Sequence, residues 1–491
     1  MQEKTENTYK QIIKATSIFG GVQVVTILTQ IIRSKIIAII LGPSGMGIVG
    51  LITTTISLLT SLTNFGLSTS AIRDVSQANK DGNIEEVTLI IKVLRRLIWF
   101  TGLSGVLLML ICAPLLSQYA FGNSNYISAF RILSLSLLFN QLTSGQIVVL
   151  QGLRKLEQMA KANVYGSIFG LLISVPLYYF FLFDAIVPAI LVTSIVAMFF
   201  SHFFSNKIKL NNNLPTIKQT IETGKSMLGA GFFLSLSAVV FLGGSFIIRA
   251  YIGKVGSIED VGLYSAGFAI IGSYVSLIFT AMHTDYYPRL SAVTSDIKMT
   301  NSLINQQGET ILLIIGPILS FFLIFANAAI VLFYSSEFSP INRMIEWAAL
   351  GMYFKAISST IVYVFLAKGA TNLFFVNELI SHSTLLVLNI VGYELFGLEG
   401  LGIAFFISYV LHIFQVFIFS KKLYLFKFEK KLCILFIIQF SIGILCFLCK
   451  TFLCKPFSFI VGIVLIIFSV LYSFFELNKR TNMFTGFWRK K

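Results

Sequence analysis

Residues 457–476 read FSFIVGIVLIIFSVLYSFFE, an apolar run whose only charged residue, Glu476, comes last. A helix needs about 20 mostly apolar residues to cross a lipid bilayer, and similar runs recur along the whole chain. Hydrophobic residues fill 56% of the 491 positions and charged residues only 12%, roughly half the charged fraction of a soluble domain. The composition therefore predicts an integral membrane protein and argues against a soluble one.

Fourteen apolar runs lie between charged residues or Gly and Pro, and each predicts a membrane-spanning helix. They are 12–41, 45–71, 88–116, 128–150, 161–182, 184–205, 225–250, 261–288, 308–334, 343–367, 372–396, 398–420, 432–449 and 457–476. We therefore expect an all-α polytopic membrane protein. The first residues, Met1-Gln2-Glu3-Lys4, mix acid and base, so we expect a retained first span and no cleavable signal peptide.

Successive spans cross the membrane in alternating directions. Most of the 37 Lys and Arg residues then fall in segments and helix ends on the same side of the membrane as the N-terminus. Because basic residues favour the cytoplasmic side, we predict that both termini are cytoplasmic. This bias also accounts for the net charge of +16 without a nucleic-acid partner. We interpret the basic tail Trp488-Arg489-Lys490-Lys491 as an interfacial anchor.

The five cysteines, at 112, 433, 446, 449 and 454, have no nearby histidines at zinc-like spacing. Cys446 and Cys449 have CxxC spacing, but they lie inside an apolar run. We therefore expect packing or lipid-facing cysteines and no metal site.

Two segments of the chain resemble each other, which predicts an internal repeat. Lys14 precedes Gly42 by 28 residues, and Lys225 precedes Gly253 by the same distance. A Gly-rich helix entry follows each glycine. Because six spans separate the copies, they are parallel repeats related by an axis along the membrane normal, and two facing lobes would enclose a central cavity.

The predicted domains follow from this repeat. They are an N-lobe of six spans over 1–210, a C-lobe of six spans over 211–425, and two extra spans with a basic tail over 426–491.

Charged residues inside spans are costly and therefore mark candidate sites. Lys355 lies 12 residues after Arg343 and 13 before Lys368, so it is about 18 Å from either helix end, too deep for its side chain to reach the interface. We interpret it as a cavity cation; the alternative is an ion pair with Glu378 that only holds helices together.

Three further cations join Lys355 as candidates for binding an anionic substrate. Arg33 and Lys35 are two residues apart and point to different helix faces, so at most one should face the cavity directly. Lys35 could also extend to the interface, and Arg249 could be an interfacial anchor at the outer end of its span.

Two carboxylates, Glu378 and Asp285, are candidates for ion coupling, because a carboxyl group in low dielectric takes up a proton more easily. Either could instead pair with a lysine. His283, His382 and His412 are expected to serve packing.

The sign of the mid-span charge separates substrate classes. Lysine and arginine in a poorly hydrated cavity favour a phosphate-bearing substrate, whereas an exporter of cationic drugs needs acidic residues. Sugars would contact hydroxyl and amide groups, for which Asn64, Asn140 and Gln141 are candidates; such residues also serve helix packing. The chain has no GxxxxGK[ST] loop, so we expect no ATP hydrolysis.

Two sets of residues resemble a known family. The turn Leu41-Gly42-Pro43-Ser44-Gly45-Met46-Gly47 resembles the LGP-x-G-x-G turn of polysaccharide exporters in the MATE-like multidrug/oligosaccharidyl-lipid/polysaccharide (MOP) superfamily. The series Trp347-x3-Gly351-x3-Lys355, then Ala367-Lys368 and Glu378, resembles the O-antigen and enterobacterial common antigen (lipid III) flippase branch. The similarity covers about residues 10–420, and the last two spans go beyond the twelve usual in that branch.

The resemblance implies two six-helix lobes that form a V and open alternately to each side of a bacterial inner membrane. It implies a flippase for an undecaprenyl-diphosphate-linked oligosaccharide, an O-antigen-type repeat unit, with no enzymatic activity and no cofactor. An ion gradient or the membrane potential would drive it. Candidate partners are a polysaccharide polymerase and a chain-length regulator. A multidrug exporter of the MATE type remains the alternative, and short outer loops argue against a polymerase or ligase.

The resemblance carries over to single residues. Lys35, Lys355, Lys368 and Glu378 fall on matching positions, and Arg33 resembles the first-helix arginine of peptidoglycan-precursor flippases. Lys368 joins Arg73 and Arg289, the arginines that end the second helix of each repeat, as predicted headgroup contacts at a cytoplasmic gate. Met352 departs from the pattern, since an acidic residue is expected there.

Overall fold

The computed structural model describes residues 2–80, 84–208, 215–454 and 456–481. Every regular element in these ranges is helical, which confirms the predicted all-α class. The predicted anchor at Trp488–Lys491 lies outside the described residues, as do the side chains of Lys14 and His283. Within the described ranges, ten helical segments are long and apolar enough to cross a membrane; several of them hold two predicted spans.

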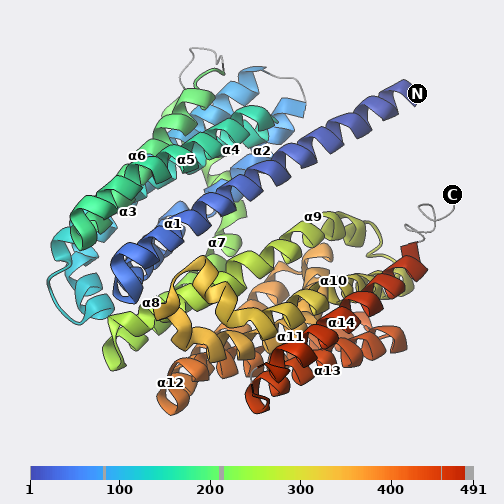
Figure 1. Cartoon of the computed structure of the whole chain (residues 1–491). Helices are drawn as coiled ribbons and strands as arrows, with labels where there is room; N and C mark the ends of the chain where they lie inside the picture. The colour runs from blue at the N-terminus through green and yellow to red at the C-terminus, as the bar shows by residue number, and fades with distance from the viewer. Residues whose placement is uncertain (1, 81–83, 209–214, 455, 482–491) are drawn as a thin grey trace. The chain divides into compact units, whose positions relative to one another are not determined.

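The helices cover all fourteen predicted spans (Figure 1). They are α1 Gln2–Asn64, α2 Leu67–Lys80, α3 Ile84–Phe121, α4 Ile127–Gly152, α5 Leu156–Phe181, α6 Ile186–Ser205, α7 Ile217–Val255, α8 Ile258–Ala269, α9 Ser276–Ala292, α10 Ile297–Phe333, α11 Asn342–Ala367, α12 Thr371–Tyr424, α13 Lys430–Phe452 and α14 Phe457–Thr481. Short 3-10 turns occupy Leu182–Ala185 and Ser336–Ile341. A π-helical turn, Ile270–Val275, joins α8 to α9 within the predicted span 261–288.

Two glycines divide the longest helices where the sequence places span boundaries. Gly42 in α1 has φ 64° and ψ −167°, and Gly397 in α12 has φ 58° and ψ −137°. Glycine adopts positive φ without the steric cost that a Cβ atom adds. Helix α12 therefore holds two predicted spans that meet at Gly397. Two spans also meet at Gly42, but α1 ends at Asn64, so the predicted span 45–71 continues through a turn into α2.

The N-terminal unit, residues 1–262, is a bundle in which α5 packs on α6, α3 on α4, and α1 on both α5 and α7. The backbone of α7 packs directly against the turn between α1 and α2. A Cβ atom on Gly66 would lie 2.1 Å from the carbonyl oxygen of Gly231. Helix α7 thus packs on N-terminal helices, although the predicted boundary at 210/211 assigned it to the C-lobe; the two lobes themselves stay a prediction.

The C-terminal unit, residues 263–491, is built around α10 and α11. Helix α11 packs on α10 and α12, and α10 also contacts α13 and α14, which run beside it in Figure 1. Tyr353 of α11 is fully buried, and its hydroxyl donates to the carbonyl oxygen of Gly316 on α10 at 3.2 Å. The two extra spans are therefore integral to the packing of this unit.

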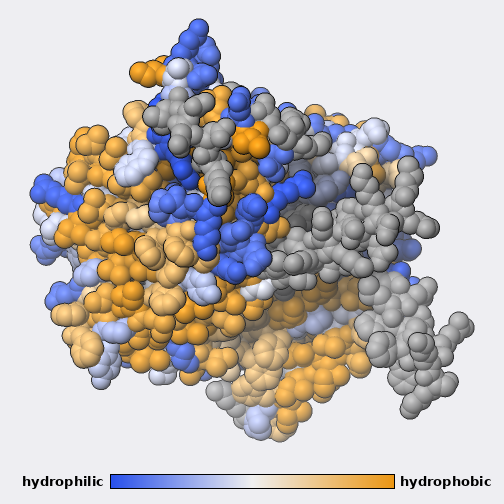
Figure 2. Space-filling view, turned by 90° about the horizontal axis from the view of Figure 1, so that it is seen from above, coloured by the Kyte–Doolittle hydropathy of each residue, from blue (hydrophilic) through white to orange (hydrophobic). Residues whose placement is uncertain are grey.

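Large apolar side chains remain on the outside of both units. Tyr179 and Phe180 on α5 are exposed, as are Val464 and Phe468 on α14. Figure 2 shows one face, where hydrophobic residues cover broad areas and hydrophilic residues gather in patches. Soluble monomers rarely expose apolar areas of this extent, so this surface suits a bilayer.

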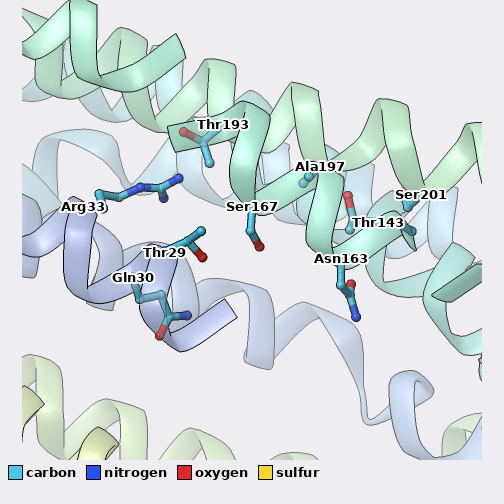
Figure 3. Close-up of a pocket in the computed structure, with 11 residues that line it drawn as sticks. Thr29, Gln30, Arg33, Thr143, Asn163, Ser167, Thr193, Ala197 and Ser201 are labelled. Atoms are coloured by element: carbon cyan, nitrogen blue, oxygen red, sulfur yellow. The ribbon is translucent and has the colours of Figure 1, made fainter. Parts of the chain in front are cut away.

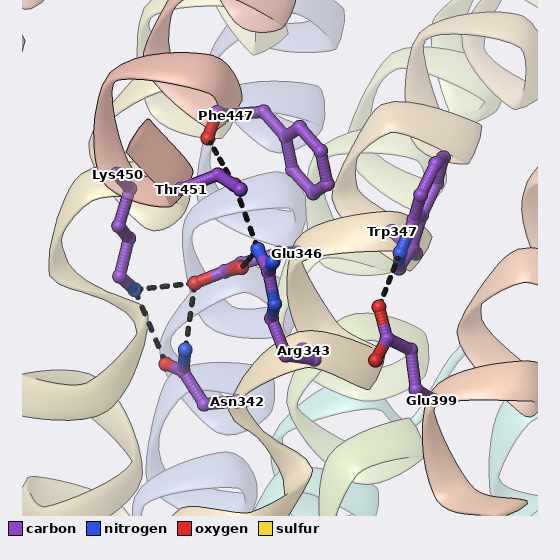
Figure 4. A network of polar contacts seen from close by, with 8 residues as sticks. All are labelled: Asn342, Arg343, Glu346, Trp347, Glu399, Phe447, Lys450 and Thr451. Atoms are coloured by element: carbon purple, nitrogen blue, oxygen red, sulfur yellow. Dashed lines mark hydrogen bonds and ion pairs between the residues drawn. The ribbon is translucent and has the colours of Figure 1, made fainter. Parts of the chain in front are cut away.

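A buried carboxylate attaches α13 to α11 (Figure 4). The Glu346 side chain is only 1% exposed. Its oxygens lie 2.6 Å from Lys450 Nζ on α13 and 3.1 Å from an Arg343 guanidinium nitrogen. A second pair, 2.7 Å between Arg480 and Glu309, joins α14 to α10. Charges removed from water need such partners.

Glu346→Gln should lower the unfolding midpoint of the purified protein, measured by intrinsic fluorescence during heating. Removing one member of a buried pair costs about 3–5 kcal/mol, and we expect about 1–3 kcal/mol because Arg343 and Lys450 keep partial access to solvent. The matched control is Glu337→Gln at an exposed carboxylate. Equal midpoints for both variants would contradict the proposed role of Glu346.

Candidate functional site

Lys355 lies within a ring of aromatic side chains in the C-terminal unit. Its Nζ atom is 5.5 Å from the ring centroid of Tyr409, 5.8 Å from that of Phe279 and 6.0 Å from that of Phe405. A cation at these distances from ring faces is attracted by their quadrupoles, most strongly where water is scarce. The mid-helix ammonium is thus sheltered by α9 and α12.

The spacing of Trp347, Gly351 and Lys355 explains how this ring forms. Residues four apart lie on one face of a helix. The indole nitrogen of Trp347 donates to Glu399 of α12 at 3.0 Å (Figure 4). One turn on, a Cβ atom at Gly351 would lie 2.8 Å from the Phe405 ring. These contacts bring α12 onto α11, and the next turn presents Lys355 to the rings.

Glu378 on α12 takes part in a polar network. His382 Nε2 lies 3.2 Å from Glu378 Oε2, and the Asn377 amide nitrogen lies 3.4 Å from the other carboxylate oxygen. Asn377 is fully buried, lies 3.4 Å from His412 Nε2, and accepts a hydrogen bond from Gln415 at 2.9 Å. This network holds together the two halves of α12.

The alternative reading of Lys355, an ion pair with Glu378, is not formed. Among the described residues, Glu378 has the imidazole of His382 within 4 Å, and Lys355 contacts the aromatic rings. Met352, where an acidic residue was expected, is fully buried in the core beside Lys355. The sequence did not single out Asn377 or Gln415, although the i, i+4 spacing of 378 and 382 was a usable signal.

Arg33 lies in a pocket of about 160 Å³ inside the N-terminal unit (Figure 3). Helices α1, α4, α5 and α6 contribute Thr29, Gln30, Arg33, Thr143, Ala162, Asn163, Gly166, Ser167, Thr193, Ala197 and Ser201. A Cβ atom at Gly170 would be 3.3 Å from a terminal nitrogen of Arg33, so this glycine makes room for the guanidinium. Lys35 is partly exposed and does not line the pocket.

The other predicted charged residues have local partners. Arg249 of α7 donates to the carbonyl oxygen of Ser245 at 2.9 Å. Asp285 and Arg289 of α9 pair with each other at 2.6 Å, with 73% and 52% of their side chains exposed. Asp285 and Arg289 therefore form a local ion pair, and ion coupling through Asp285 stays a prediction.

Two predicted gate residues also have close contacts. Arg73 is exposed and pairs with its neighbour Asp74 at 3.1 Å. Lys368, at the end of α11, donates to the carbonyl oxygen of Thr294 and lies 5.6 Å from the Tyr424 ring centroid.

The predicted sugar contacts are divided between packing and surface. Gln141 is buried, and its amide nitrogen lies 3.5 Å from the carbonyl oxygen of Thr60. Asn64 lies in the same tightly packed region, beside Ser68, with no room for a water molecule. Asn140 is partly exposed. Gln141 therefore has the position of a packing residue.

Gly351→Ala should lower the unfolding midpoint, although alanine is intrinsically better than glycine in a helix by about 1 kcal/mol. The added Cβ would lie 3.0 Å from the Phe406 backbone, so α12 must move. Gly244→Ala in α7 is the control, since nothing lies within 4 Å of its Cβ position, and it should leave the midpoint unchanged or raise it. A midpoint for Gly351→Ala at or above that of the parent protein would show that the contact is not tight.

Comparison with known proteins gives a matching family and similar relatives. The family model described as polysaccharide biosynthesis protein matches residues 36–343, well over half of the chain. The lipid III flippase of Escherichia coli (strain K12) is 21% identical over 362 residues, which cover 72% of this chain and 84% of that protein.

Solved structures share the fold. An inward-facing multidrug-resistance MATE-family transporter of the MOP superfamily matches with a TM-score of 0.70 at 14% identity, over 81% of this chain and 94% of its own. The lipid II flippase MurJ, in an inward closed conformation, matches with a TM-score of 0.67 at 16% identity, over 95% and 99%. With its match to the family model and these shared helices, the chain belongs to the polysaccharide biosynthesis protein family.

Proposed function

We propose that the chain is a flippase that moves an undecaprenyl-diphosphate-linked oligosaccharide, of the O-antigen repeat-unit type, from the cytoplasmic to the periplasmic face of a bacterial inner membrane. The observation that carries the proposal is Lys355, a cation in the middle of a membrane-spanning helix with no carboxylate partner within 4 Å among the described residues. The family and the names of the relatives support the same substrate class.

Lys355 suits a diphosphate headgroup because its ammonium is held among ring faces rather than by a carboxylate. Phosphate oxygens form strong, charge-assisted hydrogen bonds with ammonium groups where water is scarce. The headgroup would pass this cation while the lipid tail stays in the bilayer. Two lobes opening alternately to each side would carry it across, with both termini cytoplasmic.

An ion gradient or the membrane potential would drive the cycle, and Glu378 is our candidate for the coupled proton or cation. The carboxylate lies 3.2 Å from the imidazole of His382, inside a predicted membrane span. We also propose that a polysaccharide polymerase and a chain-length regulator act with the chain as partners. The proposed role is transport rather than catalysis.

A multidrug exporter of the MATE type is the second candidate, because a MATE-family structure shares the fold. The positive charge inside the bundles argues against a multidrug exporter. The two cations inside the bundles, Lys355 and Arg33, have no carboxylate within 4 Å among the described residues, and they would repel a cationic drug.

Lys355→Gln should fail to restore surface polysaccharide in a deletion strain, while lipid-linked repeat units accumulate on the cytoplasmic face. A hydrogen bond to a charged group contributes about 1.5–3 kcal/mol, so we expect transport to fall about 10- to 100-fold. Quantifying both pools, with membrane insertion checked by immunoblot, measures this.

The matched control is Lys422→Gln, which removes the same charge from an exposed position at the end of α12 and should restore transport fully. Full activity of Lys355→Gln would remove the main residue-level support for the proposal. If the deletion strain has normal polysaccharide and no accumulated precursor, a second deletion removes any redundant flippase. Normal polysaccharide in the double-deletion strain would refute the proposed substrate.

A further inference from the structure

The Arg33 pocket has room for a small oxyanion. Its volume is about 160 Å³, and about 10–15 Å³ of such volume admits one water molecule. A carboxylate group or an inorganic phosphate therefore fits this space.

The charge in the pocket is unbalanced. Arg33 is the one charged side chain among the eleven described residues that line it. Its Nε atom is buried and has no hydrogen-bond partner in the described part of the chain. Buried polar atoms in native proteins are nearly always paired, and a sheltered charge without a counter-charge is strongly unfavourable. An anion in the pocket would supply the missing counter-charge to the guanidinium.

The surrounding groups suit an oxyanion. A guanidinium presents parallel N–H donors that match two oxygens of a carboxylate or phosphoryl group. In Figure 3, Thr29 of α1 and Thr193 of α6 lie on either side of the guanidinium, and Ser167 of α5 lies farther along the pocket. The Thr29 and Thr193 hydroxyls donate to the carbonyl oxygens of Thr26 and Ala189, whereas the Ser167 hydroxyl can donate to another oxygen of the anion.

We propose that this pocket is a binding site for one carboxylate or phosphoryl group, formed within the N-terminal unit and built from other residues than the Lys355 site. The group could be the carboxylate of an acidic sugar in the transported oligosaccharide or a free phosphate. Only the first source rests on the proposed function; the existence of the anion site does not.

Purified full-length protein in nanodiscs tests the site without any transport. Its unfolding midpoint is measured against increasing sodium glucuronate and, separately, sodium phosphate, with sodium methanesulfonate keeping the ionic strength constant. At least one of the two anions should raise the midpoint of the parent protein in a saturable way, because a ligand that binds only the folded state stabilises it. A response to glucuronate alone indicates an acidic sugar as the source, and a response to phosphate indicates a phosphoryl group.

Arg33→Gln should weaken the apparent affinity for the anion at least tenfold. Arg33→Lys keeps the charge but loses the paired donors, so its affinity should lie between those of the parent protein and Arg33→Gln. Gly170→Val tests the geometry without changing the charge, since its Cβ would lie 3.3 Å from the guanidinium and 3.1 Å from Thr193. Arg131→Gln, at an exposed arginine of α4, should bind like the parent protein.

Equal saturable shifts in the parent protein and in Arg33→Gln would overturn the proposal, as would the lack of any anion-specific shift in the parent. Neither result depends on whether Lys355→Gln still transports, so failure of the anion site and failure of the proposed flippase activity are distinguishable.

Discussion

A positive charge inside a membrane-spanning bundle must be sheltered, and this constraint organises the C-terminal unit. Lipid offers no hydrogen bonds, so the backbone is satisfied within helices, and an ionised side chain needs its own local environment. Lys355 finds that environment in three aromatic rings supplied by α9 and α12. Because ring faces attract a cation without supplying a counter-charge, we propose that the ammonium can receive an anionic partner.

Holding the rings in place requires close packing of α11 and α12. Gly351 removes the side chain that would separate the helices, and the Trp347–Glu399 hydrogen bond joins the first turns of α11 to the middle of α12. Helices α13 and α14 brace the same unit from the other side through the Glu346–Lys450 and Glu309–Arg480 ion pairs. The two extra spans therefore support the unit that holds the cation. In the N-terminal unit, Gly170 plays a comparable part by giving the Arg33 guanidinium its space.

Local sequence signals were sufficient to predict the helices, and they singled out Lys355 and Arg33 as candidate cations. Apolar length located the spans, and the glycines at 42 and 397 marked where two spans meet, because a positive φ is a local property of one residue. The surroundings of those cations could not be predicted. Phe279 and Phe405 are far from Lys355 in sequence, and the partners of Asn377 include Gln415 on the other half of α12. The packing of α7 on N-terminal helices depends on the Gly66–Gly231 contact, which no periodicity reveals.

The most direct test of the central claim is a translocation assay with purified protein in liposomes that contain a defined, labelled undecaprenyl-diphosphate-linked oligosaccharide. A membrane-impermeant glycosidase added outside reports which headgroups are accessible. With active protein and an imposed ion gradient or membrane potential, we expect the accessible fraction to rise from the outer-leaflet share toward the whole pool. An accessible fraction that stays at the outer-leaflet share under every gradient, with the protein folded and inserted, would contradict it.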